Sequence, residues 1–234
     1  MVVHIERKAD LAHLIDHTLL EPSANAVQID ILCKEADDYG FYSVCVNPYY
    51  VARCKLNLRN TDVRVTSVIG FPFGATFKET KASEAAQAIR EGADELDMVM
   101  NIGAAKSGKW EEVEDDISAV SAITKDNGKV LKVILETGYL TDDEKVLACK
   151  ASESAGANFV KTSTGFGKGL ATVHDITLMA NTVGGRLGVK ASGGIHNFSD
   201  AMAMINAGAT RIGSSHSVEI VESFNVRLAD KLKR

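Results

Sequence analysis

The stretch SAGANFVKTS, at residues 154–163, joins a glycine-alanine pair to a short apolar run that contains a lysine. The same arrangement occurs in EGADELDMVM at residues 91–100 and in NAGATRIGSS at residues 206–215. In each copy a helical pattern closes at the glycine, which suits the left-handed position after a helix, and an apolar strand follows. The copies centred on Gly92, Gly156 and Gly208 therefore predict a helix-to-strand connection that is used three times.

Apolar segments that can form strands recur along the whole chain, with helical patterns between them. Eight such segments lie at residues 14–20, 43–47, 63–69, 95–101, 130–136, 159–163, 188–192 and 210–214. Apolar strands that alternate with helices indicate a parallel sheet covered by helices, and eight units in a chain of this length favour a closed barrel. The predicted fold is α/β, a single (β/α)₈ TIM barrel over residues 1–234. The capping-box sequence from Thr141 to Glu144 predicts a helix start after the fifth strand.

Composition and charge argue against several classes of partner. The net charge is −5 with acidic and basic residues intermixed, and the basic cluster that nucleic-acid binding requires is missing. No run approaches the roughly 20 apolar residues that span a bilayer, so neither nucleic acid nor a membrane is expected as a partner. The four cysteines have no CxxC spacing and the N-terminal MVVHIERKADLAHL has no secretory apolar region, which favours reduced thiols and a cytoplasmic location.

Three lysines lie inside otherwise apolar strands and are spaced 29 residues apart. They are Lys132, Lys161 and Lys190, and the equal spacing predicts that they lie at the same level of three consecutive strands. Lysine is rarely buried without a partner, so each lysine either snorkels outward between strand and helix or has a chemical purpose. Three such lysines, with Asp97 and Glu136 on neighbouring strands, favour an active site.

A pair of close lysines suits imine chemistry. An amine must be unprotonated to attack a carbonyl, and burial together with a neighbouring ammonium group lowers its pKa. One lysine would then react while the second tunes it, and a carboxylate such as Asp97 would partner the second ammonium and move protons. The sequence therefore predicts an acid, a base and a nucleophile in one barrel.

Glycine, serine and threonine follow the last three strands. In barrels of this kind the loops after strands seven and eight frequently bind phosphate through backbone N–H groups and a helix N-terminus, and serine adds hydroxyl donors. Ordinary tight turns would use the same residue types, so the position of these motifs is what favours a phosphate site. The candidate residues are Thr164, Gly165, Ser192, Gly193, Gly194, Gly213, Ser214 and Ser215.

The motifs of this chain resemble those of the deoxyribose-phosphate aldolase family, in that family's order and over nearly the whole chain. They are LIDHTLLEP (14–22), SVCVNP (43–48), VIGFPFG (68–74), GADELDMVMN (92–101), LKVILETG (131–138), FVKTSTGF (159–166), VKASGGI (189–195) and RIGSS (211–215). The combination of KTSTG with K-x-SGG on the next strand is highly specific. The resemblance implies a class I aldolase that reversibly cleaves 2-deoxy-D-ribose 5-phosphate to acetaldehyde and D-glyceraldehyde 3-phosphate.

The resemblance also implies a role for each reactive residue. Lys161 corresponds to the lysine that forms the imine, Lys190 to the second lysine, and Asp97 to the aspartate that transfers protons with Lys190 and a water molecule. Supporting roles are implied for four residues that line the site in similar proteins, namely Asp16, Thr18, Cys45 and Lys132. No cofactor and no metal are expected, the expected substrates are small phosphorylated sugars and aldehydes, and the resemblance implies a homo-oligomer, either a dimer or a tetramer.

Three departures from the family pattern affect these expectations. His196 stands where many members have arginine, and His216 stands where a small residue is common. Since imidazole changes charge near pH 6.5, His196 would replace a fixed charge at the phosphate site by a titratable one. The sequence ends in LADKLKR, without the C-terminal tyrosine that some members place near the site, so no role is carried over for that tyrosine.

Other interpretations stay open when the residues alone are considered. A phosphate-binding isomerase or synthase would use the lysines only as partners of carboxylates, and Cys45 fits a small buried apolar group as well as a site residue. A non-catalytic sugar-phosphate sensor is expected to lack one of the reactive residues, and Lys161, Lys190 and Asp97 are all present. A zinc-dependent aldolase is disfavoured because the histidines form no HxH or HExxH pair.

Overall fold

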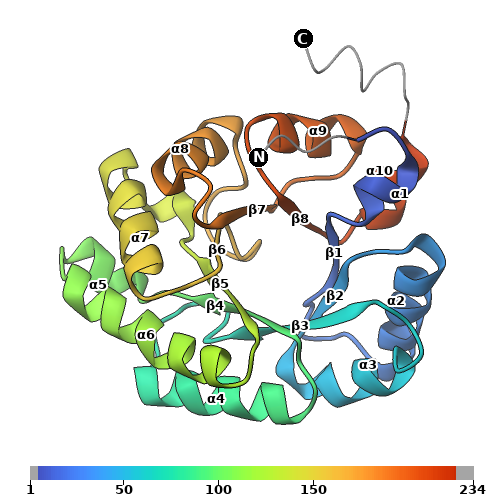
Figure 1. The fold of residues 1–234 in the computed structure, drawn as a ribbon, viewed down its shortest axis with the longest axis horizontal. Coiled ribbons are helices and arrows are strands. Elements are labelled where there is room, and N and C mark those ends of the chain that lie inside the picture. The colour runs from blue at the N-terminus through green and yellow to red at the C-terminus, as the bar shows by residue number, and fades with distance from the viewer. Residues whose placement is uncertain (1–4, 225–234) are drawn as a thin grey trace.

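The computed structural model describes residues 5–224, in which eight parallel strands form a closed barrel surrounded by helices (Figure 1). The strands are β1 (Ile15–Leu19), β2 (Ser43–Val46), β3 (Arg64–Ile69), β4 (Glu95–Val99), β5 (Val130–Ile134), β6 (Phe159–Lys161), β7 (Gly188–Ser192) and β8 (Arg211–Ser214). Each strand pairs with the next, and β8 closes the ring on β1. The predicted TIM barrel is therefore confirmed, while the C-terminal LADKLKR lies outside the described residues.

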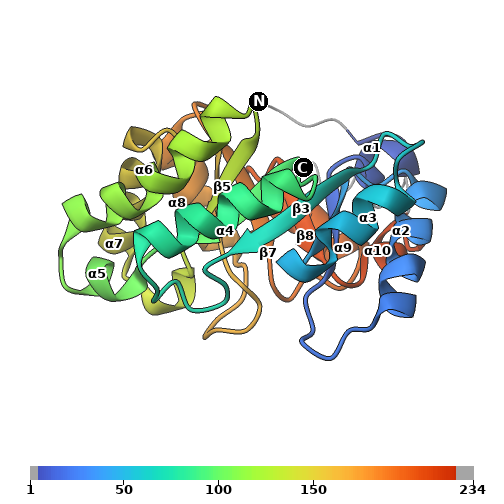
Figure 2. The ribbon, with the colours of Figure 1, turned by 90° about the horizontal axis from the view of Figure 1, so that it is seen from below.

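Ten α-helices and two short 3₁₀ turns connect or cover the strands within residues 5–224, and Figure 2 shows helices such as α4 lying along the outside of the sheet. The helices are α1 (Lys8–Ala12), α2 (Ala26–Tyr39), α3 (Val51–Asn57), α4 (Lys78–Arg90), α5 (Ile102–Lys106), α6 (Trp110–Asp126), α7 (Asp142–Ser154), α8 (Val173–Val183), α9 (Phe198–Asn206) and α10 (Ser217–Glu222), and the turns are η1 (Pro48–Tyr50) and η2 (Thr137–Tyr139). None of the helices in this range has the length and apolar character needed to cross a membrane.

The three predicted helix-to-strand connections are present. Gly92, Gly156 and Gly208 follow the ends of α4, α7 and α9, and their φ angles are 109°, 80° and 116°. A positive φ is costly for residues with a Cβ, so glycine ends each helix and lets the chain turn directly into β4, β6 or β8. The capping box at the start of α7 is confirmed as well, because the Thr141 hydroxyl accepts the Glu144 N–H and the Glu144 carboxylate accepts the Thr141 N–H.

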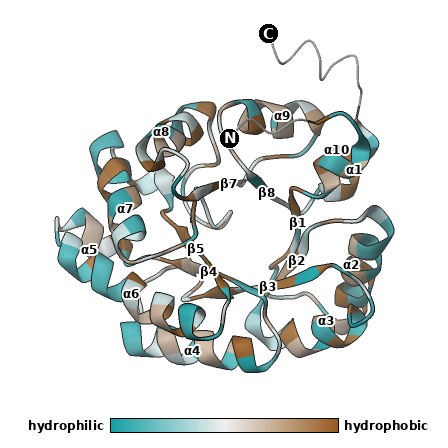
Figure 3. Ribbon diagram, in the orientation of Figure 1, coloured by the Kyte–Doolittle hydropathy of each residue, from teal (hydrophilic) through white to brown (hydrophobic). Residues whose placement is uncertain are grey.

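Alternate residues of the strands face two different environments. Leu96, Met98 and Val133 belong to the large apolar core that packs against the helices, and Figure 3 shows β4 and β5 mainly in the hydrophobic colour while the outer helices carry much of the hydrophilic one. Because strand side chains alternate between faces, the residues between these positions point into the barrel. Several of them, including Asp97 and Lys132, are charged and completely buried. The barrel interior is therefore filled by charged and polar side chains, and the apolar core lies between the sheet and the surrounding helices.

Candidate active site

The three strand lysines all enter the barrel interior, but they do not share one strand register. Lys161 on β6 is the register partner of Lys190 on β7, whereas Lys132 on β5 pairs with Phe159, two residues before Lys161. The equal spacing in sequence therefore corresponds to a common register for Lys161 and Lys190 and not for Lys132. The reason is that an equal spacing in sequence also counts the helix and loop between two strands, whose lengths do not fix the strand register.

Asp97 on β4 brings the three lysines together. Its carboxylate lies 2.7 Å from the Nζ atom of Lys132, 2.9 Å from that of Lys161 and 2.8 Å from that of Lys190. All four side chains are at most 3% exposed. Burial opposes the charge of Asp97, but the neighbouring lysines, Lys132 foremost, outweigh it and hold the pKa of this carboxyl well below its usual value. Asp97 is thus an ionised acceptor at the centre of the cluster.

The surroundings shift the two central lysines in opposite directions. Burial lowers the pKa of Lys161, and the charge of Lys190 acts in the same direction against the attraction of Asp97. Burial also opposes the charge of Lys190, but the carboxylates of Asp16, at 2.5 Å, and Asp97 outweigh it and raise the pKa of this lysine. Lys161 is therefore the amine that is favoured in the neutral, nucleophilic form, and Lys190 remains an ammonium group.

Two charged residues extend the cluster and were missed by the sequence reasoning. The Arg211 guanidinium lies 2.8 Å from the Asp16 carboxylate and 3.0 Å from that of Glu95, which in turn lies 2.7 Å from the Nζ atom of Lys132. The sequence could have indicated both residues, because Glu95 precedes Asp97 by two positions and Arg211 precedes Gly213 by two positions in their strands. In a strand this spacing places side chains on the same face.

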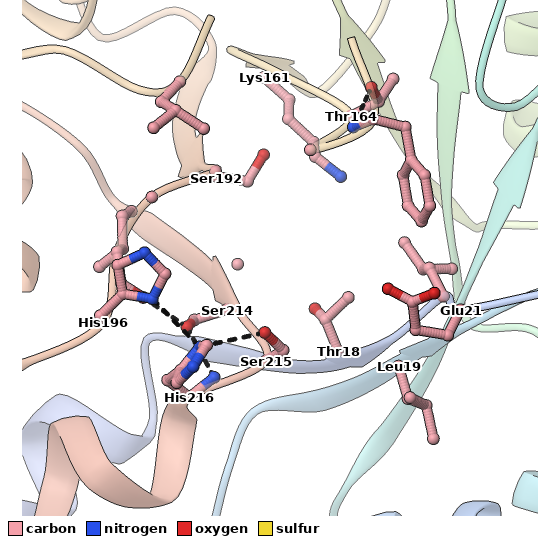
Figure 4. A pocket seen from close by; sticks show the side chains of 18 residues that line it. Thr18, Leu19, Glu21, Lys161, Thr164, Ser192, His196, Ser214, Ser215 and His216 are labelled. Carbon is pink, nitrogen blue, oxygen red and sulfur yellow. Dashed lines mark hydrogen bonds between the residues drawn. The ribbon is translucent and has the colours of Figure 1, made fainter. Parts of the chain in front are cut away.

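A cavity of about 410 Å³ opens at the carboxyl ends of the strands. Of the three lysines, only Lys161 lines it. Figure 4 shows the Lys161 amine projecting into the cavity beside Thr164, while Ser214, Ser215 and the two histidines gather on the other side. Of the three lysines, Lys161 is therefore the one that a molecule in the cavity can contact.

The predicted site residues divide into two groups. Those that line the cavity are Thr18, Lys161, Thr164, Gly165, Ser192, Gly193, Gly194, Gly213, Ser214 and Ser215. The others lie beneath the cavity in the barrel interior and are completely buried, namely Asp16, Cys45, Asp97, Lys132 and Lys190. The cavity also has lining residues that were not predicted, including Glu21, Phe166 and Leu170.

Asp16, Lys132 and Cys45 differ most from their expected place on the wall of the site. The first two serve the charged cluster under the cavity floor, because they are fully enclosed by their ion-pair partners. Cys45 packs with Leu20, Val68 and Phe71 in a small apolar cluster, and burial raises the pKa of its thiol. This environment agrees with the alternative that Cys45 is a small buried apolar group.

In the candidate phosphate loops the glycine backbone lines the cavity as the sequence predicts, but two of the serine hydroxyl groups are already used within the protein. Gly193 and Gly194 have φ angles of 93° and 74° and form a half-buried bend on the cavity wall. The hydroxyl groups of Ser192 and Ser214 already donate to the carbonyl oxygens of Ser163 and Ile195 at 2.6 and 2.7 Å. They are therefore structural donors, so a bound anion would be held by backbone N–H groups and the rim side chains.

His196 and His216 form a contact pair at the rim of the cavity. Their Nδ1 atoms are 3.2 Å apart, and the rings meet edge to face with a centroid distance of 4.5 Å. A hydrogen bond between two ring nitrogens needs one N–H group and one lone pair, so the pair in this geometry cannot carry a proton on both facing atoms. The Ser215 hydroxyl lies 3.2 Å from the same nitrogen of His216.

Glu136 supports the loop on the opposite side of the cavity instead of facing the lysines directly. It follows the end of β5 with a φ of 55°, and its carboxylate accepts the N–H and hydroxyl groups of Thr164 at 3.1 and 2.5 Å. A Cβ atom at Gly167 would lie 2.8 Å from the Glu136 carboxyl carbon, so a larger residue at this position would require the Glu136 side chain to shift. Burial raises the pKa of Glu136.

A second group of potential ligand atoms lies outside the cavity, between α7 and α8. Asp142, His174 and Asp175 bring their side-chain atoms within 4.8 Å of one another. The Nζ atom of Lys145 lies 3.0 Å from Asp142 and 2.6 Å from Asp175. The lysine ammonium thus already neutralises these carboxylates, and the group is explained as an ion-pair cluster that joins two helices.

Comparisons with known proteins agree on one family. The family model described as DeoC/LacD family aldolase matches residues 11–217. The deoxyribose-phosphate aldolase of Aciduliprofundum boonei is 55% identical over 217 residues, which cover 93% of this chain and 98% of the relative. The enzyme of the same name from Lactococcus lactis is 56% identical over 208 residues, covering 89% and 94% of the two chains.

Solved structures give the same result. A putative deoxyribose-phosphate aldolase from Coccidioides immitis superposes with a TM-score of 0.90 at 46% identity, over 92% of this chain and 86% of the other. The deoxyribose phosphate aldolase from Aeropyrum pernix, described as a tetramer of unique structure, superposes with a TM-score of 0.89 at 37% identity, over 94% and 93% of the two chains.

Proposed function

The chain belongs to the DeoC/LacD family of aldolases, and from this premise we propose that it is a deoxyribose-phosphate aldolase that works through an imine on Lys161. The reaction is the reversible cleavage of 2-deoxy-D-ribose 5-phosphate to acetaldehyde and D-glyceraldehyde 3-phosphate. The observation that carries the mechanism is that Lys161 alone among the interior lysines both lines the cavity and has a lowered pKa. An isomerase or a sensor would not need a neutral lysine at that position.

The proposed reaction begins when the neutral Lys161 amine attacks the aldehyde carbon of the open-chain sugar, one proton is taken up from the relay described below, and water leaves. The resulting iminium ion is an electron sink. Loss of the proton from the C3 hydroxyl forms a carbonyl at C3, and the electrons of the C2–C3 bond move to C2 and the iminium to give an enamine. D-glyceraldehyde 3-phosphate departs, protonation of C2 regenerates the iminium ion, and hydrolysis frees acetaldehyde and Lys161.

Asp97 and Lys190 are proposed to carry the protons in these steps. Asp97 is ionised and hydrogen-bonded to both lysines, so it can accept a proton while Lys190 can donate one. Neither side chain lines the cavity, and a water molecule between them and the substrate would complete the relay. A positioned acid or base of this kind contributes about 10²- to 10⁴-fold to a rate.

Borohydride trapping tests this function. Reduction in the presence of acetaldehyde or 2-deoxy-D-ribose 5-phosphate is expected to attach the substrate carbons irreversibly to one lysine, and peptide mapping by mass spectrometry is expected to locate them on Lys161. A matched sample with borohydride and no aldehyde controls for unspecific reaction. If Lys161 remains unmodified although the protein is folded, the imine mechanism is wrong.

The phosphate of the substrate is proposed to bind at the rim formed by Gly193, Gly194, Ser215 and the histidine pair. The support is the convergence of positive-φ glycine backbone and two imidazole rings on one wall of the cavity (Figure 4). The substrates would accordingly be small phosphorylated sugars and aldehydes. A homo-oligomer is also proposed, since the Aeropyrum pernix relative is described as a tetramer, and the cytoplasmic location stays a prediction from the sequence.

His196→Arg is expected to strengthen the binding of the phosphorylated sugar at about pH 8. A guanidinium group keeps its charge at this pH and can bind a phosphate group through two parallel N–H donors. The variant should therefore have a KM about three- to ten-fold lower than the wild type at about pH 8. Unphosphorylated 2-deoxyribose is the control, and its KM should not respond. An unchanged KM for the phosphorylated sugar at the higher pH would contradict the role of His196.

A further inference from the structure

Arg211 closes the end of the barrel that lies opposite the cavity. It is the first residue of β8, as Glu95 is of β4, and both side chains are buried among the amino ends of the strands. The guanidinium carbon lies 3.5 Å from the ring centroid of Tyr42 and 5.3 Å from that of Phe159. Two aromatic faces therefore hold this cation in place and shield it from solvent.

Arg211 and Glu95 connect to the reactive lysine by two chains of ion pairs. One runs from Arg211 through Asp16 and Lys190 to Asp97, with contacts of 2.8, 2.5 and 2.8 Å. The other runs from Arg211 through Glu95 and Lys132 to Asp97, with contacts of 3.0, 2.7 and 2.7 Å. Both chains end on the carboxylate that contacts Lys161, so a change of charge at the closed end reaches the site through groups that solvent does not screen.

The numbers of charges in this cluster do not match if every group is ionised. The buried cations are Lys132, Lys161, Lys190 and Arg211, and the buried carboxylates are Asp16, Glu95 and Asp97. The half-exposed Arg64 also reaches Glu95, at 3.6 Å, but solvent screens its charge. One buried positive charge would then lack a counter-charge, which is costly in a medium of low polarity. The imbalance disappears if one lysine is neutral.

Lys161 is the lysine that gives up its proton most easily. It contacts one carboxylate, Asp97, whereas Lys190 contacts two and Lys132 contacts three at up to 3.7 Å. With Lys161 neutral, three cations face three carboxylates. The neutrality of the nucleophile is thus tied to the exact balance of the remaining six charges, two of which lie at the closed end.

We propose that Glu95 and Arg211 are positioning residues that keep Lys161 in its neutral, reactive state by balancing the charge of the buried cluster from the closed end of the barrel. This inference rests on the proposed imine mechanism. Neither residue lines the cavity, so neither is a catalytic residue. Their effect on the reaction is exerted through Asp16, Asp97 and the two flanking lysines.

Substitutions of opposite charge are expected to have opposite effects. The rate of imine formation falls at low pH because Lys161 becomes protonated, and we call this part of the pH profile the acid limb. Glu95→Gln leaves one extra positive charge, which disfavours the Lys161 ammonium form and moves the acid limb to lower pH. Arg211→Met leaves one extra negative charge and moves that limb to higher pH. A unit charge at this range within a protein corresponds to a shift on the order of one pH unit. The double variant Glu95→Gln/Arg211→Met restores the balance and should return the limb to the wild-type position.

The other titratable groups that act on Lys161 are unchanged in these variants. They are Asp97 on β4, Lys190 on β7 and the Cys45 thiol on β2, with Glu136 after β5 as a more remote group. Burial raises the pKa values of Cys45 and Glu136. These four groups are the same in the wild type and the variants. If the acid limb moves in opposite directions in the two single variants, the cause is therefore the changed charge of Glu95 or Arg211.

The test uses the full chain and acetaldehyde, which carries no titratable group. The rate at which cyanoborohydride traps the imine on Lys161 is measured between about pH 5 and pH 10 for the wild type, both single variants and the double variant. Arg53→Gln is the control, because Arg53 is half-exposed and pairs with the half-exposed Asp30 at 2.7 Å, away from the buried cluster, so solvent screens its charge. Its acid limb should stay with that of the wild type.

Each outcome decides for or against the proposal. Opposite shifts in the single variants, with the limb restored in the double variant, support it. Unmoved limbs, or two shifts of the same sign, overturn it, since general structural damage would not depend on the sign of the charge. If a single variant does not fold, the double variant decides, because it removes both partners of a buried pair, and a displaced limb there overturns the proposal. Failure to trap Lys161 in the wild type at any pH would instead overturn the proposed function.

Discussion

Lys161→Met is expected to lower kcat by at least about four orders of magnitude and to abolish borohydride trapping. The variant has no amine at the only interior lysine position that lines the cavity, and neither Lys132 nor Lys190 can reach the substrate from beneath the floor. Methionine matches the length of the lysine stem and fills the same space. Steady-state cleavage of 2-deoxy-D-ribose 5-phosphate and mass spectrometry of the reduced protein measure the two effects.

The stability of the Lys161→Met variant provides a second and independent test. If Lys161 is neutral in the folded protein, the wild type gives up a proton on folding, which costs free energy. Methionine removes this cost and leaves the charge of the cluster unchanged, so the free energy of unfolding should not fall below the wild-type value. Lys190→Met is the matched control, because it deprives Asp16 and Asp97 of an ammonium group and should cost about 3–5 kcal/mol. Denaturant unfolding compares the two. Equal destabilisation of both variants would show that Lys161 is charged at rest.

Asp97→Asn is expected to lower kcat by about 10²- to 10⁴-fold while Lys161 can still be trapped by borohydride. The amide cannot accept a proton as the carboxylate does, so the steps that move protons slow down. The nucleophile survives, because loss of a negative charge next to Lys161 favours the neutral amine. The combination of slow turnover with efficient trapping is the result that separates the proton carrier from the nucleophile.

The control for Asp97→Asn is Asp116→Asn. Asp116 on α6 is also a buried aspartate paired with a lysine, because its carboxylate lies 2.7 Å from the Nζ atom of Lys81 on α4. It lies outside the cavity and the lysine cluster, so its substitution should reduce stability and leave kcat of the folded enzyme unchanged. A loss of trapping in Asp97→Asn at all pH values would contradict the assignment of Asp97 to proton transfer alone.

Much of the fold followed from local physical chemistry. The left-handed glycines at Gly92, Gly156 and Gly208 and the capping box at Thr141 were visible in the sequence, because φ and the hydrogen bonds of a helix end are set by residues close in the chain. The strands came out in the predicted number and order. Several proved shorter at their carboxyl ends, where the chain leaves the sheet to build the site; residues 135 and 136 are examples.

The sequence by itself therefore determined the barrel, the three buried lysines and, through the family motifs, the reaction. Only the tertiary structure decided how these residues act on one another. Strand register, which depends on the whole packed ring, offset Lys132 by two residues from the register that Lys161 and Lys190 share. Contacts between strands distant in sequence added Glu95 and Arg211 to the cluster. The pKa of a buried lysine is set by burial and by the charges that surround it in space, so the lowered pKa of Lys161 is a property of the assembled barrel.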